Sequence, residues 1–339
     1  MVSLHQPVHF DRLGNRLKEF FGFQDVLSCE LVHGGYMSQN FRVETDKGTY
    51  FLKQYRNRIN TNIYEIKEAE AFFASGGIQI ISPIKDRYER EAFWDGEHWF
   101  SLFPFIFSQS PIATKMNLTL VGNLARTLSR IHLVGQSFPK LPFQLLRIGT
   151  ERKFHLEQVE LLRILQGHKQ KTALEERMMD ILRKKAVYKR DVIIQPQDLL
   201  LSYDRLLHGD YQYTNVFIDQ TDEVTHVYDL ERACLGPTEY EVVRSLMLNC
   251  FDDGWKPRNF SHARHYLNEY RSNHPLSFDL FRQAMHLYAY NILHMTWIEA
   301  RYLVFGIDTQ LDLFNRHADR VEFFATQNID SFCEETFPM

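Results

Sequence analysis

The stretch "HGDYQYTNVFIDQTDEVTHVYDLE", residues 208–231, holds side chains whose types and spacing could bind a divalent metal ion. Its runs "NVFID" and "EVTHVYDL" predict two strands of an antiparallel hairpin, joined by a polar turn at 220–223. A hairpin brings the start of its first strand beside the end of its second, within roughly 5 Å for paired residues. Asn215 and Asp229 would therefore present an amide oxygen and a carboxylate side by side. Such hard oxygen ligands suit Mg²⁺, which keeps much of its shell for water and phosphates.

Asp210 lies upstream in the same loop as Asn215, so we expect both side chains to face the same ligand. A carboxylate at this place can orient an attacking hydroxyl toward a phosphorus atom, and phosphoryl transfer depends on positioning and charge neutralisation. His208 and Gly209 would shape the loop, because glycine permits backbone turns that other residues resist. Each residue taken singly could be a turn or cap residue. Their order along the chain favours a phosphoryl-transfer site.

The pattern resembles the catalytic loop and metal-binding element of the aminoglycoside phosphotransferase and choline kinase-like families, which are relatives of the protein kinases. Those families carry His-Gly-Asp, four residues, Asn, and then an apolar–Asp–aromatic–Glu element; this chain has "HGDYQYTN" followed by "VYDLE". The resemblance implies that Asp210 is the catalytic base and that Asn215 and Asp229 hold magnesium. The chain departs from the family at 212–214, where His-Pro-Gly is usual, and at Glu241, where an aspartate is usual.

The same resemblance implies an amino-terminal lobe with a glycine-bearing turn, a strand lysine and a helical glutamate, and the chain supplies them in that order. Gly34 and Gly35 in "LVHGGYMSQNFRV" would let backbone amides approach the nucleotide phosphates. Lys53 in "GTYFLKQY" would reach the phosphates as a point charge. Its partner is expected on the next helix, where the spacing favours Glu65 and leaves Glu68 as the alternative.

The segment "WFSLFPFIF" resembles the connector whose backbone reads the adenine of ATP, with Phe103 and Phe105 as flat flanks for the base. A plain core strand accounts for the same letters. No motif marks an acceptor pocket. Trp297 and Glu299, in an aromatic stretch with helical spacing, are candidates for it, with core packing as the alternative.

The elements that must position these residues follow from the hydrophobic periodicity. Helices are expected over 8–22 and 61–75, and strands at about 28–33, 40–45, 49–55, 78–84 and within 97–107. From about residue 114 helical spacing dominates.

We expect an α+β, two-lobed protein-kinase-like fold. A small antiparallel-sheet lobe over 1–107 would bind the nucleotide, and a larger, mostly helical lobe over 108–339 would carry the catalytic loop. Within it, the charged segment 150–190 predicts a helical pair or a solvated insertion. A basic cluster there predicts a solvated helix end, with an anionic partner surface as the sharper alternative; its members are Arg183, Lys184, Lys185, Lys189 and Arg190.

Composition excludes several other classes of function. The formal net charge of −4 argues against nucleic acid as a partner, because phosphate contacts need a basic face. No apolar run approaches the roughly 20 residues of a membrane span, and the first residues lack the apolar core of a secretion signal, so we expect synthesis in the cytoplasm. The four cysteines are scattered without a CxxC pair, which favours reduced thiols.

A narrower resemblance concerns the chain length, the charged insertion, "HGDYQYTNVF" and the aromatic-rich tail, which look like the CotS/YutH-type spore coat proteins of endospore-forming bacteria. These are kinase-like in fold and are structural parts of the coat. Two functions therefore stay open. One is ATP- and magnesium-dependent phosphoryl transfer to a hydroxyl of an unidentified acceptor, and the other is non-catalytic assembly with coat proteins.

Overall fold

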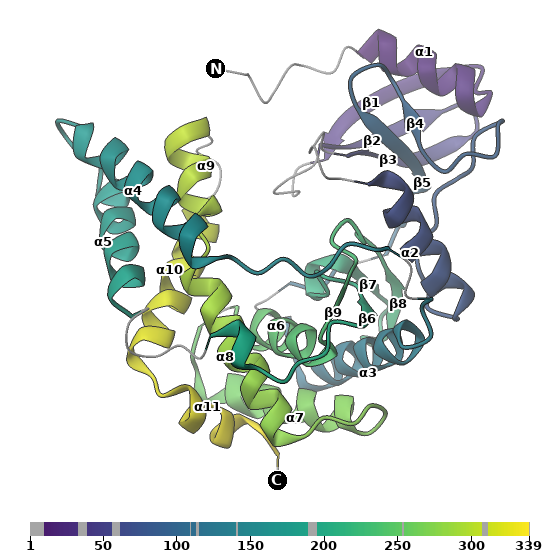
Figure 1. Cartoon of the computed structure of the whole chain (residues 1–339). Helices are drawn as coiled ribbons and strands as arrows, with labels where there is room; N and C mark the ends of the chain where they lie inside the picture. Colours follow the sequence, from purple (N-terminus) through teal and green to yellow (C-terminus); the bar gives the residue numbers. More distant parts are fainter. Residues whose placement is uncertain are drawn as a thin grey trace. The chain divides into compact units, whose positions relative to one another are not determined.

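The computed structural model describes residues 10–32, 39–55, 62–108, 110–112, 115–139, 142–188, 195–252, 254–306 and 311–338 (Figure 1). They form two compact units. The first contains the chain up to Ser110 together with Val216–Thr221 and Thr225–Arg232, and the second contains the rest. Most of the hairpin after the loop 208–215 thus belongs to the first unit, whereas the sequence analysis placed it in the lobe 108–339.

A five-stranded antiparallel sheet with the order β1-β2-β3-β5-β4 forms the centre of the first unit. Its strands are β1 (Val26–Val32), β2 (Asn40–Thr45), β3 (Gly48–Tyr55), β4 (Phe93–Trp94) and β5 (Trp99–Pro104).

The turn from β2 to β3 lies between the two strands expected at 40–45 and 49–55. Gly48 has a φ of +129°, which residues with a side chain rarely adopt, and the Thr45 hydroxyl donates a hydrogen bond to its carbonyl (3.0 Å). The register sets Lys53 of β3 between Asn40 of β2 and Ser101 of β5. Lys53 therefore lies on a central strand, where both neighbours hold the backbone.

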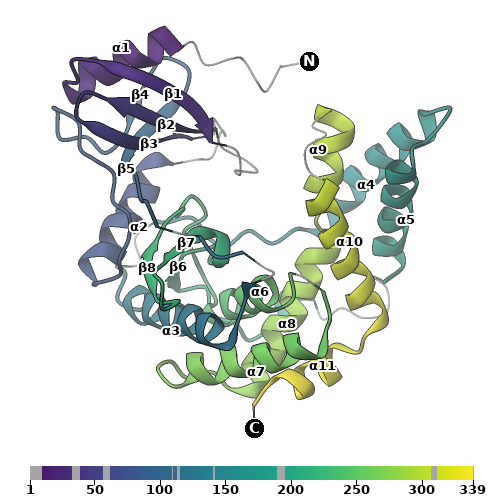
Figure 2. The same ribbon diagram turned by 180° about the vertical axis from the view of Figure 1, so that it is seen from behind.

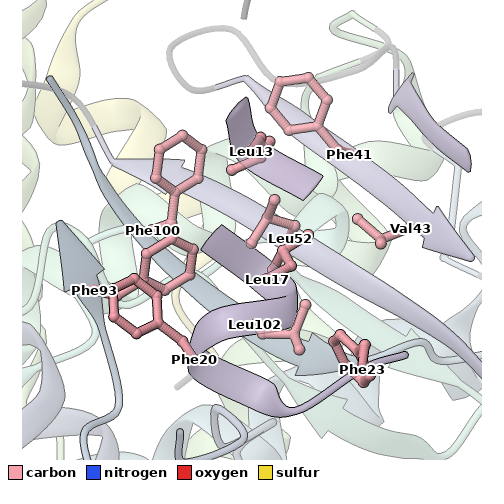
Figure 3. Packing of buried hydrophobic residues seen from close by; sticks show 10 residues of the cluster. All are labelled: Leu13, Leu17, Phe20, Phe23, Phe41, Val43, Leu52, Phe93, Phe100 and Leu102. Carbon is pink, nitrogen blue, oxygen red and sulfur yellow. The ribbon is translucent and has the colours of Figure 1, made fainter. Parts of the chain in front are cut away.

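Helix α1 (Phe10–Phe21) packs on this sheet through one apolar stripe. Leu13, Leu17 and Phe20 recur at helical spacing, and their side chains are buried. Figure 3 shows them together with the sheet side chains that complete the cluster: Phe23, Phe41, Val43, Leu52, Phe93, Phe100 and Leu102. Burial of each large apolar side chain contributes about 1.5–3 kcal/mol, so this cluster fixes the strands around Lys53.

Helix α2 (Ile63–Ser75) follows β3 and confirms the helix expected over 61–75. Asn62 caps its first turn by accepting a hydrogen bond from the Tyr64 N–H (3.1 Å). The strand expected near 78–84 is wrong: in the described part of this segment, Ile80 makes only an isolated parallel bridge with Val227.

That bridge ties the hairpin strands β7 (Val216–Ile218) and β8 (Val224–Val227) to the first unit. The Ile81 N–H donates to the Val227 carbonyl (3.1 Å), and the Val227 N–H donates to the Gln79 carbonyl (2.8 Å). The segment after α2 thus gives its backbone hydrogen bonds to the end of a distant hairpin, and this contact cannot be found from local periodicity.

The second unit is mostly helical (Figures 1 and 2). Its helices are α3 (Leu118–Gly135), α4 (Glu151–Gly167), α5 (Ala173–Tyr188), α6 (Thr238–Cys250), α7 (Pro257–Arg271), α8 (Phe278–Leu293), α9 (Trp297–Phe305), α10 (Leu311–Thr326) and α11 (Ile329–Thr336). Two short strands, β6 (Arg205–Leu207) and β9 (Cys234–Gly236), pair antiparallel.

Helix α3 lies directly against β6, the strand that leads into the loop 208–215. A Cβ atom at Gly135 would come within 2.2 Å of the Leu206 carbonyl oxygen, so this close approach requires glycine. On its other side α3 packs against α7. The strand before the loop is therefore held by backbone contact as well as by its pairing with β9.

The charged segment 150–190 forms the helical pair α4 and α5, which lie side by side in both views (Figures 1 and 2). The prediction that Lys185 belongs to a solvated helix end is wrong. Lys185 is fully buried, and its ammonium contacts Glu299 of α9 (2.5 Å) and the Met295 carbonyl (2.6 Å). Lys189 and Arg190 lie outside the described residues.

None of the described helices combines the length and the apolar character that crossing a membrane requires. The four cysteines lie in the described residues, and none of them is in a disulfide.

Candidate active site

The loop 208–215, which we call the candidate catalytic loop, is anchored by a buried carboxylate of α6. Glu241 accepts hydrogen bonds from the backbone N–H groups of His208 (3.0 Å) and Gly209. The His132 imidazole of α3 lies 3.0 Å from the same carboxylate. Burial alone would raise the pKa of Glu241, but the hydrogen bond with His132 and the backbone hydrogen bond from Gly209 outweigh it and lower that pKa below its usual range. Glu241 thus fixes the loop as an anion, although it is one methylene longer than the aspartate usual at this place.

Gly209 turns the candidate catalytic loop with a φ of +80°, in the left-handed region that favours glycine. His208 is buried, and its Nδ1 accepts a hydrogen bond from the Asp210 N–H (3.2 Å). The expected shaping role of this His-Gly pair is therefore visible in the backbone. Its effect is to fix the main chain at Asp210.

Asp210 and Asn215 are brought together within the second unit. The Asn215 side-chain amide donates to the Asp210 carbonyl oxygen (2.8 Å), and the Asn215 N–H donates to the Gln212 carbonyl (2.9 Å). Because the NH₂ end of the Asn215 amide is engaged, its oxygen is the end that could bind a cation. The loop thus orients an amide oxygen and the Asp210 side chain from one compact turn.

Arg244 of α6 is a site residue that the sequence analysis missed. Its Nη2 forms an ion pair with Asp210 Oδ1, to which Gln212 also donates (3.2 Å). A signal was available: Arg244 follows Glu241 by three residues, and residues three apart share one helix face. Once Glu241 is placed under the loop, Arg244 has to lie beside it.

Lys53 and Asp229 are brought together within the first unit. Lys53 is buried, and its Nζ lies 2.8 Å from Asp229 Oδ1 and 2.8 Å from Glu231 Oε1. Burial by itself would lower the pKa of Lys53, but the two carboxylates outweigh it and raise that pKa well above its usual value. Asp229 has a φ of +67°, a left-handed conformation that aspartate tolerates better than most residues. One ammonium therefore holds two carboxylates.

The ion pair expected between Lys53 and Glu65 is not the one that the structure shows. Among the described residues, the carboxylates that pair with Lys53 are those of Asp229 and Glu231. Glu65 is half-buried, and the alternative Glu68 is exposed.

The buried carboxylate of α2 is Glu70, which pairs with Lys67 (2.8 Å). Lys67 also donates to the Tyr55 hydroxyl (2.7 Å). Helix α2 is rotated about its axis so that positions 67 and 70 face the sheet. The distance of a glutamate from the helix end does not reveal this rotation.

The two aromatic residues expected beside the adenine lie at the end of β5. Phe103 is buried, with the Lys67 ammonium 4.9 Å from its ring centre, and Phe105 faces the Arg42 guanidinium at 5.5 Å. Their role in base binding stays a prediction. Gly34 and Gly35 lie outside the described residues.

The residues present fit a magnesium–nucleotide ligand. Asp229 and Glu231 place two carboxylates on one ammonium, which leaves net negative charge where a divalent cation would be bound. In the described ranges no group of three or more His, Cys, Asp or Glu side chains forms a metal cluster. Magnesium needs no such cluster, since it is commonly bound by one or two carboxylates together with substrate phosphates and water.

Comparison with known protein families shows the family to which this chain belongs. Residues 28–275 match the phosphotransferase enzyme family, which is most of the chain. The chain belongs to this phosphotransferase family. It is thus a kinase-type protein, and the match includes the candidate catalytic loop, Lys53 and the hairpin.

Curated relatives of this phosphotransferase include homoserine kinases at low identity. The homoserine kinase of Bradyrhizobium sp. (strain ORS 278) is 24% identical over 282 residues, which cover 81% of this chain and 80% of the relative. The homoserine kinase of Rhodopseudomonas palustris (strain ATCC BAA-98 / CGA009) is 23% identical over 277 residues, covering 81% of this chain and 79% of the relative.

Solved structures confirm the expected fold class. Amicoumacin kinase hAmiN, in complex with AMP-PNP, Ca²⁺ and Ami, has a TM-score of 0.60 at 13% identity, covering 94% of this chain and 93% of that chain. Spectinomycin phosphotransferase, in complex with ADP and spectinomycin, has a TM-score of 0.60 at 14% identity, covering 98% and 99%. A microcompartment-associated aminopropanol kinase has a TM-score of 0.61 at 13% identity, covering 94% and 98%. The phosphotransferase therefore has the α+β kinase-like fold, with a small antiparallel sheet and a mostly helical remainder.

Proposed function

We propose that this phosphotransferase uses ATP and magnesium to phosphorylate a hydroxyl group of a small molecule. The observation that carries the proposal is the buried Lys53 ammonium between Asp229 and Glu231. Such a cluster can bind both partners of a metal–nucleotide complex: the ammonium binds phosphate oxygens, and the carboxylate of Asp229 binds the metal.

Each residue of the site then has a role in the reaction. Magnesium bound with ATP would supply charge neutralisation at the phosphates. Lys53 would hold phosphate oxygens, and Asn215 and Asp229 would hold the metal. Asp210 orients the acceptor hydroxyl and accepts its proton, and Glu241 keeps the loop rigid while this happens.

L-Homoserine is the first acceptor to test, because homoserine kinases match this chain over about four fifths of both lengths. Phosphoryl transfer can be followed by ³¹P NMR with Mg-ATP and the acceptor. Asp210→Asn is expected to abolish turnover while Mg-ATP still raises the melting temperature, since the variant keeps the shape of the side chain.

Two results would reject the proposal. One is unchanged turnover in Asp210→Asn. The other is a native protein whose melting temperature does not rise at saturating Mg-ATP, because a ligand that binds the folded state must stabilise it.

We also propose, from the sequence resemblance to spore coat proteins, a second role as an assembly protein of the spore coat. The observation that favours it is a set of exposed apolar side chains in the second unit, among them Leu200 (83% exposed), Leu156 (62%) and Val187 (61%). In an endospore-forming host, a fluorescent fusion should then collect on the coat, and Asp210→Asn cells should build a normal coat where deletion cells do not. Uniform fluorescence throughout the spore-forming cell would reject this role.

A further inference from the structure

Arg244 places a cation directly on the carboxylate that we assign to the acceptor hydroxyl. Its Nη2 contacts Asp210 Oδ1, and both side chains retain some exposure, 19% for Arg244 and 18% for Asp210. The pair belongs wholly to the second unit. Any acceptor that brings its hydroxyl to Asp210 must therefore meet this guanidinium.

The second terminal nitrogen of Arg244 lacks a partner. Among the described residues, Nη1 is shielded from solvent and makes no hydrogen bond. A buried donor without an acceptor is energetically costly, so its persistence needs an explanation. A guanidinium binds carboxylates through two parallel N–H groups, and a bound carboxylate oxygen would satisfy Nη1.

A second guanidinium, that of Arg320, lies in the neighbourhood of Arg244. Tyr240 and Tyr288 lie within electrostatic reach of the Arg244 guanidinium, and Tyr288 is within reach of Arg320 as well. Arg320 contacts Asp252 (2.6 Å).

Asp252 also pairs with Arg316 (3.0 Å) and accepts a hydrogen bond from the hydroxyl of Tyr213 in the candidate catalytic loop (2.8 Å). With Arg244 and Arg320, this neighbourhood holds three guanidinium groups. Three carboxylates lie beside them: Asp210, Asp252, and Glu241 of the same helix as Arg244. These charges cancel, so it is the unpartnered Nη1 of Arg244 that favours an acidic ligand over an amine.

We propose that the acceptor is a short-chain hydroxy acid, whose carboxylate is bound by Arg244 while its hydroxyl is oriented by Asp210. This inference rests on the proposed function. One guanidinium contacts both Asp210 and the acceptor carboxylate, so the hydroxyl and carboxylate of the acceptor are only a few bonds apart. In the reaction, the hydroxyl oxygen bonds to the γ-phosphorus as the bond to the β–γ bridging oxygen breaks. The bond electrons leave with ADP, and the hydroxyl proton passes to Asp210.

The first experiment uses the unaltered protein and matched acceptors. L-Homoserine is compared with its carboxamide, and L-serine with serinamide, in the presence of Mg-ATP. The acids are expected to react with kcat/KM about 10- to 100-fold higher than the amides, the value of a charge-assisted hydrogen bond. Equal kcat/KM for acid and amide, or a preference for ethanolamine and other amino alcohols, overturns the inference.

The second experiment varies the guanidinium. Arg244→Met should abolish the preference for the acid, and Arg244→Lys, which keeps the charge but loses the fork, should raise KM for the acid with a smaller change in kcat. Arg282→Gln is the control, because it removes a surface guanidinium that pairs with Asp279 on α8 (3.1 Å). A preference for the acid that survives in Arg244→Met overturns the inference.

Binding provides a readout that does not need turnover. With Mg and a non-hydrolysable ATP analogue, the hydroxy acids should raise the melting temperature of the native protein and not that of Arg244→Met. If the nucleotide binds but no hydroxy acid binds or reacts, this inference fails and the proposed function stands. If Mg-ATP itself does not bind, the proposed function fails.

Discussion

Lys53 of the first unit and Lys185 of the second are both buried and are neutralised in different ways. Lys53 contacts two carboxylates, Asp229 and Glu231, whereas Lys185 contacts one, Glu299. Burial lowers the pKa of both ammonium groups. At Lys53 the two carboxylates overcome burial and raise the pKa, and at Lys185 burial prevails and the pKa is lowered.

The difference separates a structural ion pair from a candidate binding site. Lys185 and Glu299 are both fully buried and cancel each other's charge, so nothing remains for a ligand. Around Lys53 the carboxylates keep part of their surface, 33% of Asp229 and 18% of Glu231, and exceed the ammonium in charge. Burial alone therefore does not distinguish the two lysines, and the number of carboxylates that each one contacts does.

The largest expected effect is on stability, at Lys185. Lys185→Met should lower the free energy of unfolding by about 3–5 kcal/mol, because it leaves the Glu299 carboxylate buried without a cation. Urea denaturation measures the loss. Lys184→Met is the matched control: Lys184 pairs with Asp180 and Glu322 at the surface, so its loss should cost less than about 1 kcal/mol.

A double variant tests whether this pair is only structural. Lys185→Met with Glu299→Leu should recover most of the lost stability, because two apolar side chains can replace a buried ion pair. If Lys184→Met and Lys185→Met lose equal stability, the contrast between the two buried lysines disappears.

The next effect is on activity, at Lys53. Lys53→Met should lower kcat/KM for ATP by about 100- to 1,000-fold, because it removes a fixed charge that stabilises the transferring phosphates. Its cost in stability should be smaller than that of Lys185→Met, since Asp229 and Glu231 reach solvent. Steady-state kinetics and urea denaturation measure the two quantities. Lys47→Met, at the turn before β3, is the control and should keep full activity; a Lys53→Met protein with native kinetics would contradict the assignment.

A smaller effect concerns the metal without nucleotide. In Lys53→Met the two carboxylates have no ammonium to neutralise them, so Mn²⁺ should bind about tenfold more tightly than to the native protein. Titration followed by electron paramagnetic resonance of free Mn²⁺ measures this change. Adding Glu231→Gln should cancel the gain, and an unchanged affinity in Lys53→Met would show that the carboxylates do not act together.

The smallest expected effect is a pH dependence at Lys185. In the native protein, burial and the charges of Lys185 and Arg320 lower the pKa of His317 well below 6.5. As the pH drops below about 6.5, the unfolded chain therefore binds a proton at His317 that the folded protein does not bind, and the free energy of unfolding falls. In Lys185→Met, His317 faces the unpaired Glu299 at 4.0 Å, and its pKa should rise above 6.5. The pH dependence of stability that comes from His317 then changes sign, because the protonated imidazole replaces the lost ammonium as the partner of Glu299.

The stability lost in Lys185→Met should therefore be about 1 kcal/mol smaller at pH 5.5 than at pH 8. Urea denaturation at both pH values measures it. Lys185→Met with His317→Asn should show no such recovery at low pH, and a loss that is independent of pH would mean that His317 does not respond to Glu299.

The site residues that the sequence predicts lie in strands or next to them, in a recognisable order along the chain. Lys53 on β3, and Asp229 at the end of the hairpin, lie in elements whose type was readable from alternation, and the structure joins their side chains. The Asn215 amide and Asp210 were readable from the loop and are also joined. Their chemical roles stay predictions.

The residues that were missed depend on contacts between distant elements. The partner of Lys53 on α2 was sought by distance from the helix end, but the rotation of the helix decides which glutamate is buried, and Glu70 is already taken by Lys67. Lys185 was read as exposed because its neighbours are charged. Only the position of α9 shows that the ammonium of Lys185 pairs with Glu299. The composition of the segment therefore predicts that it forms helices, but it does not predict which of its polar side chains are buried against other helices.

The discontinuous first unit has a consequence for synthesis on the ribosome. Lys53 precedes Asp229 by 176 residues, so a nascent chain that has just exposed Ser110 contains the sheet but neither carboxylate for its central ammonium. Domains generally fold as they emerge, but here the amino-terminal part would have to bury an uncompensated cation. We expect the amino-terminal part of the unit to remain incompletely folded and bound by chaperones until the hairpin leaves the exit tunnel and supplies the two carboxylates.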